Sequence, residues 1–283
     1  MVEAWDVNMY QDLEVVQDRK VAKKQLMTYL IIGFTLTYFL AFLTILLFLH
    51  ITPEFSIIQE WYFLFFYLNT AGGYFIFISH FVLMLKVVVI RFKLLNTAFT
   101  TKLTKKVFMT HSLDEIENVI IKISILHNEI NAFIDLGNKL FSVQMIPFLA
   151  MFMNYLIFTT FQFYQVFIKY DRILLIKTVI NVPWIVWSAT LVLLIVHNAS
   201  KILDLSQELA IKIHNTINHL DPSHYGLVIR RLKYFSQQIQ HRTPIVSCGL
   251  FEIDYSLLFN VSIKMAGAFT TFVVILIQFD SSK

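Results

Sequence analysis

The stretch QLMTYLIIGFTLTYFLAFLTILLFLHITP, residues 25–53, contains no charged side chain. A helix rises about 1.5 Å per residue, so roughly 20 apolar residues span the hydrocarbon core of a bilayer. This stretch is longer than that, and its apolar residues do not alternate with polar ones as they do in the roughly 10-residue strands of a membrane barrel. The stretch therefore predicts a membrane-spanning helix.

Four further stretches are similar, the last of them interrupted only by Lys264, and the whole chain is 57% hydrophobic and only 15% charged. That is more apolar surface than one soluble core of this length would bury. We therefore expect an all-α fold, a polytopic membrane helical bundle that forms a single domain over residues 1–283. Its five transmembrane helices are expected at about residues 25–50, 61–86, 141–167, 177–199 and 255–279.

The basic residues predict the orientation of these helices. Of the 23 Lys and Arg residues, four precede the first span, eight lie between Lys86 and Lys139, and six lie between Lys201 and Arg242. Cytoplasmic segments of membrane proteins carry the excess of Lys and Arg. We therefore expect residues 1–24, 87–140 and 200–254 in the cytosol and, after five crossings, the carboxyl terminus outside. Lipid of the plasma membrane is the first expected partner.

The two long cytosolic connections are expected to be helical extensions of the spans. Apolar residues recur there at steps of three and four, which is typical of a helix with one buried face. The Thr243-Pro244 pair should end the second of these helices. The positions of the two stripes are Ile116, Val119, Ile120, Ile123, Leu126, Ile130 and Phe133, then Val228, Leu232, Phe235 and Ile239.

The sequence gives no sign of enzyme chemistry. It contains no HExxH, GxxxxGK[ST], GxGxxG or GxSxG motif, and His127-Asn128-Glu129 lacks the PCxxC that would complete a zinc deaminase site. A single cysteine, Cys248, excludes an internal disulfide and a cysteine-built zinc site. We expect no catalytic residues, no metal, no cofactor and no nucleic-acid partner.

The last predicted span carries a narrow stripe of small and polar residues. Gly267, Thr271, Val274 and Gln278 follow one another at steps of four, three and four, so they share one face of a helix. Small residues allow helices to approach closely, and an amide on such a face can meet water around a symmetry axis. The alternative is an ordinary span with a polar end at the membrane interface.

The end of this span resembles the signature of the insect gustatory receptor family. In that family Thr-Tyr is followed by five hydrophobic residues and Gln-Phe, and here Thr271-Phe272 is followed by residues 273–277 and Gln278-Phe279. Two further segments are similar to the family, the lead-in QHRTPIVSCGLFEIDYSLLFN and the segment RFKLLN, Arg91 to Asn96. The similarity in topology extends over essentially the whole chain.

The resemblance implies a ligand-gated, non-selective cation channel of four subunits with the last helix around one pore. Gln278 and Phe279 would form the gate at the outer end, with Val274 and Thr271 on the same pore-facing stripe. Thr271 and Phe272 would hold the helix against its neighbours. Phe272 departs from the family's tyrosine and lacks its hydroxyl. The family also has seven spans, and the five here correspond to its third to seventh.

A ligand site is expected in the outer half of the bundle, where aromatic and polar side chains gather. Such a mixture suits a small polar or aromatic tastant. The alternative is that Trp61 anchors the membrane interface and that the amides only bond helix to helix. The candidate residues are Trp61, Asn69, Thr159, Gln162, Asn181, Trp184 and Ser188.

We therefore predict a gustatory receptor subunit that opens a cation channel when an external tastant binds, as a homo- or hetero-tetramer with other chemoreceptor subunits. One alternative is an odorant receptor-like subunit of the same architecture. Another is a truncated, non-conducting subunit that lacks two spans and modulates full-length receptors. A membrane enzyme lacks a nucleophile and base cluster. An alternating-access transporter would need broken helices in matching halves.

Overall fold

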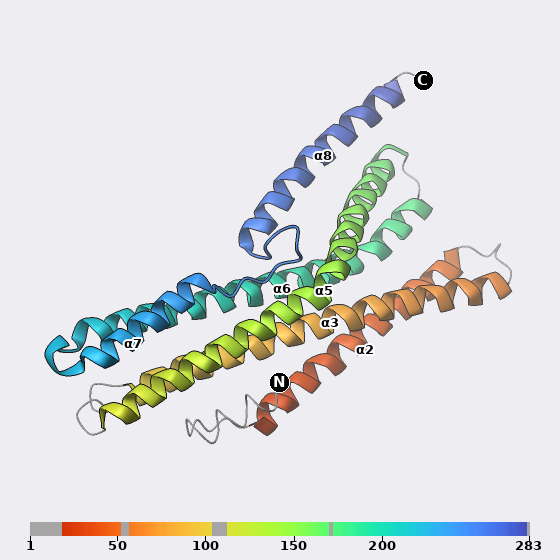
Figure 1. Cartoon of the computed structure of the whole chain (residues 1–283). Helices are drawn as coiled ribbons and strands as arrows, with labels where there is room; N and C mark the ends of the chain where they lie inside the picture. Colours follow the sequence, from red (N-terminus) through yellow and green to blue (C-terminus); the bar gives the residue numbers. More distant parts are fainter. Residues whose placement is uncertain (1–18, 52–56, 104–111, 170–171, 282–283) are drawn as a thin grey trace. The chain divides into compact units, whose positions relative to one another are not determined.

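The computed structural model describes residues 19–51, 57–103, 112–169 and 172–281, and six helices lie in this part of the chain. Figure 1 shows them in order along the sequence. The all-α fold predicted from the sequence is confirmed. The helices are α2 (Arg19–Ile51), α3 (Ile57–Lys102), α5 (Leu113–Lys169), α6 (Arg172–His219), α7 (Pro222–His241) and α8 (Tyr255–Ser281).

The chain forms two compact units, and three of the helices contribute to both. We call the described residues of Leu83–Ser142 and His197–Asp254 the polar unit, because they include most of the charged side chains. The described residues of Lys20–Val82, Val143–Val196 and Tyr255–Lys283 form the apolar unit. The change of unit within α3, α5 and α6 falls where the sequence changes from an apolar span to an amphipathic extension.

The core of the polar unit is built from one apolar stripe on each of its four helices. The two stripes predicted from the sequence are largely confirmed, because Ile116, Ile120, Ile123, Leu126 and Ile130 of α5 are buried, as are all four predicted positions of α7. Val119 and Phe133 are only half-buried. α3 and α6 complete the core with buried residues at the same spacing, among them Leu85, Val88, Phe92, Leu95, Ile202, Leu209 and Ile213.

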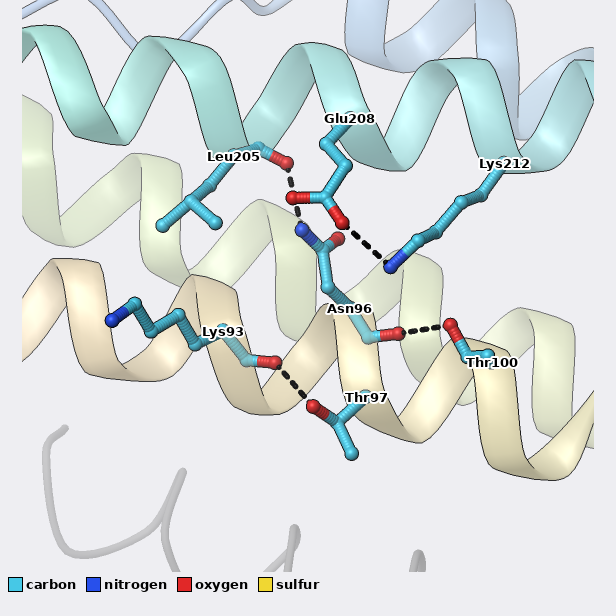
Figure 2. Close-up of polar contacts among 7 residues, drawn as sticks. All are labelled: Lys93, Asn96, Thr97, Thr100, Leu205, Glu208 and Lys212. Carbon is cyan, nitrogen blue, oxygen red and sulfur yellow. Dashed lines mark hydrogen bonds and ion pairs between the residues drawn. The ribbon is translucent and has the colours of Figure 1, made fainter.

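Polar side chains join α3 to α6 inside this unit, as Figure 2 shows. Asn96 is buried, and its Nδ2 donates a hydrogen bond to the Leu205 carbonyl over 3.0 Å. The Asn96 carbonyl in turn accepts from Thr100 Oγ1 over 2.8 Å. Glu208 and Lys212 form an ion pair one helical turn apart on α6. A buried amide that bonds a backbone carbonyl of another helix sets the register of the two helices.

α7 ends where the sequence predicts, at His241, with Arg242 as its cap. The connection that follows, residues 242–254, folds back on itself. The Ile253 amide donates to the Val246 carbonyl over 2.8 Å, and the Cys248 amide donates to the Phe251 carbonyl over 3.1 Å. Gly249 lies in the tip of this turn with φ of +82°, a conformation that is costly for residues with a Cβ.

The apolar unit leaves large apolar side chains uncovered. Ile31, Phe39, Phe158 and Phe167 are each more than half exposed. By length and composition, two stretches of the described residues could cross a membrane, Leu113–Ile168 and Asn181–His219, and Ile31–Thr44 is a shorter apolar stretch. So much exposed apolar surface is what a lipid-facing bundle presents. The count of five spans and their limits stay a prediction.

Candidate functional site

The stripe predicted on the last helix lies on α8, and all four of its residues are exposed in the single chain. Gly267, Thr271, Val274 and Gln278 are all exposed, Val274 at 47%. A Cβ added to Gly267 would meet no atom within 4 Å. The small and polar face of α8 is therefore exposed in the described part of the chain.

The hydroxyls on this helix bond within it. Thr271 Oγ1 donates to the Gly267 carbonyl over 2.9 Å, and Thr270 Oγ1 donates to the Ala266 carbonyl over 2.8 Å. A threonine that bonds the carbonyl four residues before it needs no partner from another helix, so it suits an apolar span. The predicted gate and packing residues Phe279 and Phe272 lie in α8, but their side chains are outside the described residues.

Two of the predicted ligand residues contact each other across two helices of the apolar unit. Asn181 Nδ2 of α6 donates a hydrogen bond to Gln162 Oε1 of α5 over 3.1 Å. Both side chains are half-buried. The bond ties α6 to α5, as the packing alternative predicts. It also places one amide of each helix together, where a polar ligand group would have two convergent partners.

Trp184 and Thr159 lie on the same two helices, α6 and α5, but their polar groups have different surroundings. Trp184 Nε1 donates to Thr44 Oγ1 of α2 over 2.8 Å, so α6 is also joined to α2. Thr159 of α5 is fully buried, and within the described residues its hydroxyl has no hydrogen-bond partner. Ser188 is half-buried, one turn beyond Trp184 on α6. The side chains of the other two candidates, Trp61 and Asn69 of α3, lie outside the described residues.

A comparison with protein families identifies the chain at this point. The description "7tm Chemosensory receptor" matches residues 2–283, nearly the whole sequence. The chain belongs to the 7tm chemosensory receptor family. No curated protein matches it. Family membership and the exposed apolar helices together make it a membrane chemoreceptor, as the sequence predicts.

The segment Arg91–Asn96, which resembles gustatory receptors, occupies the core of the receptor's polar unit. Arg91 is only 3% exposed, and its guanidinium lies over the Phe133 ring at 5.6 Å from the centroid. Asn96 makes the bond to Leu205 shown in Figure 2. The two buried polar residues of the segment thus join α3 to α5 and to α6. Their role in the described chain is to hold these three helices together.

Sequence reasoning missed a set of polar contacts between α5 and α7. Glu117, Ser124, Asn131 and Asn138, which we call the polar ladder, are seven residues apart on α5. Glu117 pairs with Arg231, and Ser124 Oγ donates to Gln238 Oε1 over 2.6 Å. The partners of these two residues are themselves seven residues apart on α7. α5 and α7 therefore run parallel, with one face of each in contact.

The last two residues of the polar ladder, Asn131 and Asn138, form hydrogen bonds to the segment that follows α7. Asn131 Nδ2 donates to the Arg242 carbonyl over 2.8 Å. Asn138 makes two bonds, because its Nδ2 donates to the Ile245 carbonyl over 2.8 Å and its Oδ1 accepts from the Ser247 amide over 3.1 Å. One side chain thus satisfies a carbonyl and an amide of the connection, as a neighbouring strand would.

His127 is the most deeply buried titratable group on α5. It is 0% exposed, and its ring meets Phe92 of α3 and Phe235 of α7 edge to face, with both centroid distances 5.8 Å. Neither ring nitrogen has a hydrogen-bond partner in the described residues. Burial disfavours the imidazolium and lowers the pKa of His127 from 6.5 to about 4. His127 is thus a neutral core residue at neutral pH, and no group of residues that could hold a metal lies in the described chain.

Proposed function

We propose that this chemoreceptor is a subunit of a ligand-gated, non-selective cation channel, opened by an external tastant, with α8 lining the pore. The observation that carries the proposal is the exposed stripe of Gly267, Thr271, Val274 and Gln278 on one face of α8. It stands beside family membership over residues 2–283 and the resemblance of residues 271–279 to gustatory receptors.

Physical reasoning supports a pore for this face of α8. A helix that faces only lipid gains nothing from a glycine and an amide on one side, because both lose packing or hydrogen bonds there. Around an axis shared by several copies, the glycine allows close approach and the amide of Gln278 meets water. Most of the remaining side chains of the helix are apolar and suit lipid or the receptor's own bundle, with Asn260, Lys264 and Thr270 as exceptions within it. A tetramer and a plasma-membrane location belong to this proposal.

The tastant is proposed to bind in the apolar unit near the pair formed by Asn181 and Gln162. Two convergent amides, the indole of Trp184 and the buried hydroxyl of Thr159 supply donors, acceptors and an aromatic wall. Binding energy that favours one arrangement of α5 and α6 over another would shift a closed-to-open equilibrium. The chemistry fits a small molecule with polar groups and an apolar or aromatic body.

The test of the channel proposal is the current through cells that express the receptor with Gln278→Ala. We expect the ligand-free or ligand-evoked current per surface subunit to change at least severalfold, because the polar end of the stripe is removed. The matched control is Ile275→Ala, which removes an exposed side chain about 100° around the helix from Val274. Its current should stay within about twofold of the unsubstituted receptor. Equal currents in all three at matched surface levels would remove α8 as the pore helix.

The same cells separate the gustatory from the odorant-type alternative. A gustatory receptor subunit of this kind should respond when it is expressed alone or with other gustatory subunits. An odorant-type subunit would give current only together with an obligate co-receptor. Expression with and without such a co-receptor, followed by the same Gln278→Ala comparison, decides between them.

A further inference from the structure

The connection of residues 242–254 links α7 to α8, and its own fold provides few hydrogen bonds. The described backbone bonds within it are the two across its turn, from Ile253 to Val246 and from Cys248 to Phe251. A segment with so little regular structure opens easily unless other parts of the molecule hold it. Here α5 holds it, through the amides of Asn131 and Asn138.

These two asparagines bind the connection near its start. Asn131 is 7% exposed and caps the Arg242 carbonyl, directly after the last residue of α7. Asn138, two helical turns further along α5, forms hydrogen bonds to the backbone on both sides of Val246, a residue only 3% exposed. Each such bond stabilises the folded chain modestly, and a partly buried backbone group that loses its partner is destabilising. Together they fix residues 242–247 against α5.

We propose that Asn131 and Asn138 are positioning residues that clamp the connection to α5 and so set the place from which α8 starts. α8 begins at Tyr255, directly after the connection ends at Asp254. A displacement of the first turn of α8 must therefore pull on the clamp or bend the chain beyond it. In its bearing on gating, the inference rests on the proposed function, because it treats α8 as the helix that moves when the channel opens.

The clamp also connects α5 to α8 along the chain, because residues 242–254 lead directly into α8. α5 is one helix, Leu113–Lys169, and it carries the ladder residue Asn138 as well as the proposed ligand residues Thr159 and Gln162. A shift or rotation of α5 caused by a ligand would reach residues 245–247 through the two bonds of Asn138. This is a physical coupling between named groups, and each of its parts can be removed separately.

Cys248 provides a reporter of the clamp, because it is the only cysteine of the chain and lies one residue beyond Ser247. It is 2% exposed, so a thiol reagent reaches it only when the connection opens. The experiment measures the rate at which N-ethylmaleimide, which crosses membranes, labels Cys248 in membranes that contain the full chain. Asn138→Ala should raise this rate about tenfold, since it removes two bonds to the connection. Asn138→Asp keeps the acceptor for the Ser247 amide and should raise it less.

Two controls separate the clamp from a general loss of stability. Asn118→Ala removes an exposed asparagine of α5 that lies outside the polar ladder, and labelling should not change. Leu232→Ala opens a cavity in the core of the same unit and leaves the ladder residues in place. It should lower the melting temperature more than Asn138→Ala does. N-ethylmaleimide should nevertheless label Cys248 more slowly in Leu232→Ala than in Asn138→Ala. Labelling of Asn138→Ala within twofold of the unsubstituted chain, or no faster than that of Leu232→Ala, would overturn the clamp.

Currents from the same variants test the link to gating. If α8 lines the pore, Asn138→Ala should change the ligand-free current per surface subunit, whereas Asn118→Ala should not. Faster labelling without any change in current, in cells where Gln278→Ala does change it, would overturn the coupling. If the unsubstituted receptor carries no current, the proposed function fails, and the labelling comparison alone decides whether Asn138 holds the connection.

Discussion

At the scale of single residues, the polar unit depends on a few buried or half-buried polar side chains whose partners lie far away in the sequence. Asn96 bonds the carbonyl of Leu205, and Asn138 bonds the backbone on both sides of Val246. His127 differs from both, because its neighbours are the aromatic rings of Phe92 and Phe235. Its burial therefore stabilises only the neutral form of the ring, and this makes the stability of the unit sensitive to acid.

We expect the receptor to lose stability as the pH falls from about 6.5 towards 4, in part through His127. The pKa of this group is about 4 in the folded chain and 6.5 in the reference state, so the unfolded chain binds the proton first. This stability is fully present above about pH 6.5, and its loss amounts to about 3 kcal/mol at most by the time the pH reaches 4. The measurement is the melting temperature of the detergent-solubilised protein as a function of pH.

The matched variants for this measurement are His127→Leu and His224→Leu. His127→Leu removes the titrating group and its two unpaired nitrogens, so it should leave stability at pH 7.5 within about 1 kcal/mol and flatten the fall in acid. His224 is exposed on α7, and its replacement controls for the loss of a histidine as such. The same acid sensitivity in all three proteins would show that groups other than His127 cause it.

Trp184 and Thr44 offer a test of the packing contacts in the apolar unit. We expect Trp184→Phe and Thr44→Val to destabilise less together than the sum of their separate effects, because both remove the same hydrogen bond. The coupling should be about 0.6 kcal/mol, the usual size for such a bond within a membrane. Thr190→Val is the control partner, since Thr190 bonds the carbonyl of Val186 on its own helix. Additive effects in both pairs would exclude a stabilising bond at Trp184.

At the scale of the helices, amphipathic periodicity carries most of the stability of the polar unit. α7 has buried residues at Val228, Leu232, Phe235 and Ile239 and exposed ones such as Leu227 between them. Its first turn is capped by Asp221, whose carboxylate accepts from the Ser223 amide, and this bond holds the pKa of Asp221 below its usual range. Among the leucines of this helix, Leu232 is buried in the core and Leu227 is exposed.

Leu232→Ala should destabilise the receptor by about 2 to 5 kcal/mol, because Leu232 is 0% exposed and its removal leaves a cavity. Leu227 is 68% exposed on the same helix, so Leu227→Ala should stay within about 0.5 kcal/mol of the unsubstituted protein. Thermal unfolding followed by the loss of helical circular dichroism compares the two. A similar cost for both would place an unseen partner over Leu227.

The helices and their apolar stripes could be predicted from the sequence because both depend on residues three or four positions apart. The polar ladder could not, although its seven-residue spacing is visible beside the stripe of Ile116, Ile120 and Ile123. On a single helix, Glu117, Ser124, Asn131 and Asn138 look like a solvated face. Their partners lie more than 100 residues away, at Arg231, Gln238, Arg242, Ile245 and Ser247. Only the packing of α5 against α7 shows that these side chains are used.

At the scale of the whole molecule, the proposals for pore, ligand and clamp all depend on the number and direction of the membrane crossings. If Lys and Arg mark the cytosolic side, the polar unit, with residues 83–142 and 197–254, is inside the cell, and the end of α8 with Gln278 is outside. The clamp on residues 242–254 would then act at the inner end of α8. The predicted gate would be at its outer end, about one helix length away.

This orientation predicts the accessibility of the two ends of the chain in intact cells. An epitope added after Lys283 should bind antibody without permeabilisation, whereas an epitope before Met1 should bind only after the membrane is opened. An odd number of crossings requires this difference, because the ends then lie on opposite sides. A permeabilisation-dependent epitope in residues 104–111, between α3 and α5, provides the internal control, since Lys105 and Lys106 lie there. If both ends were accessible only after permeabilisation, the number of crossings would be even and not five, Gln278 would not reach the outer surface, and the gate would have to be sought elsewhere on α8.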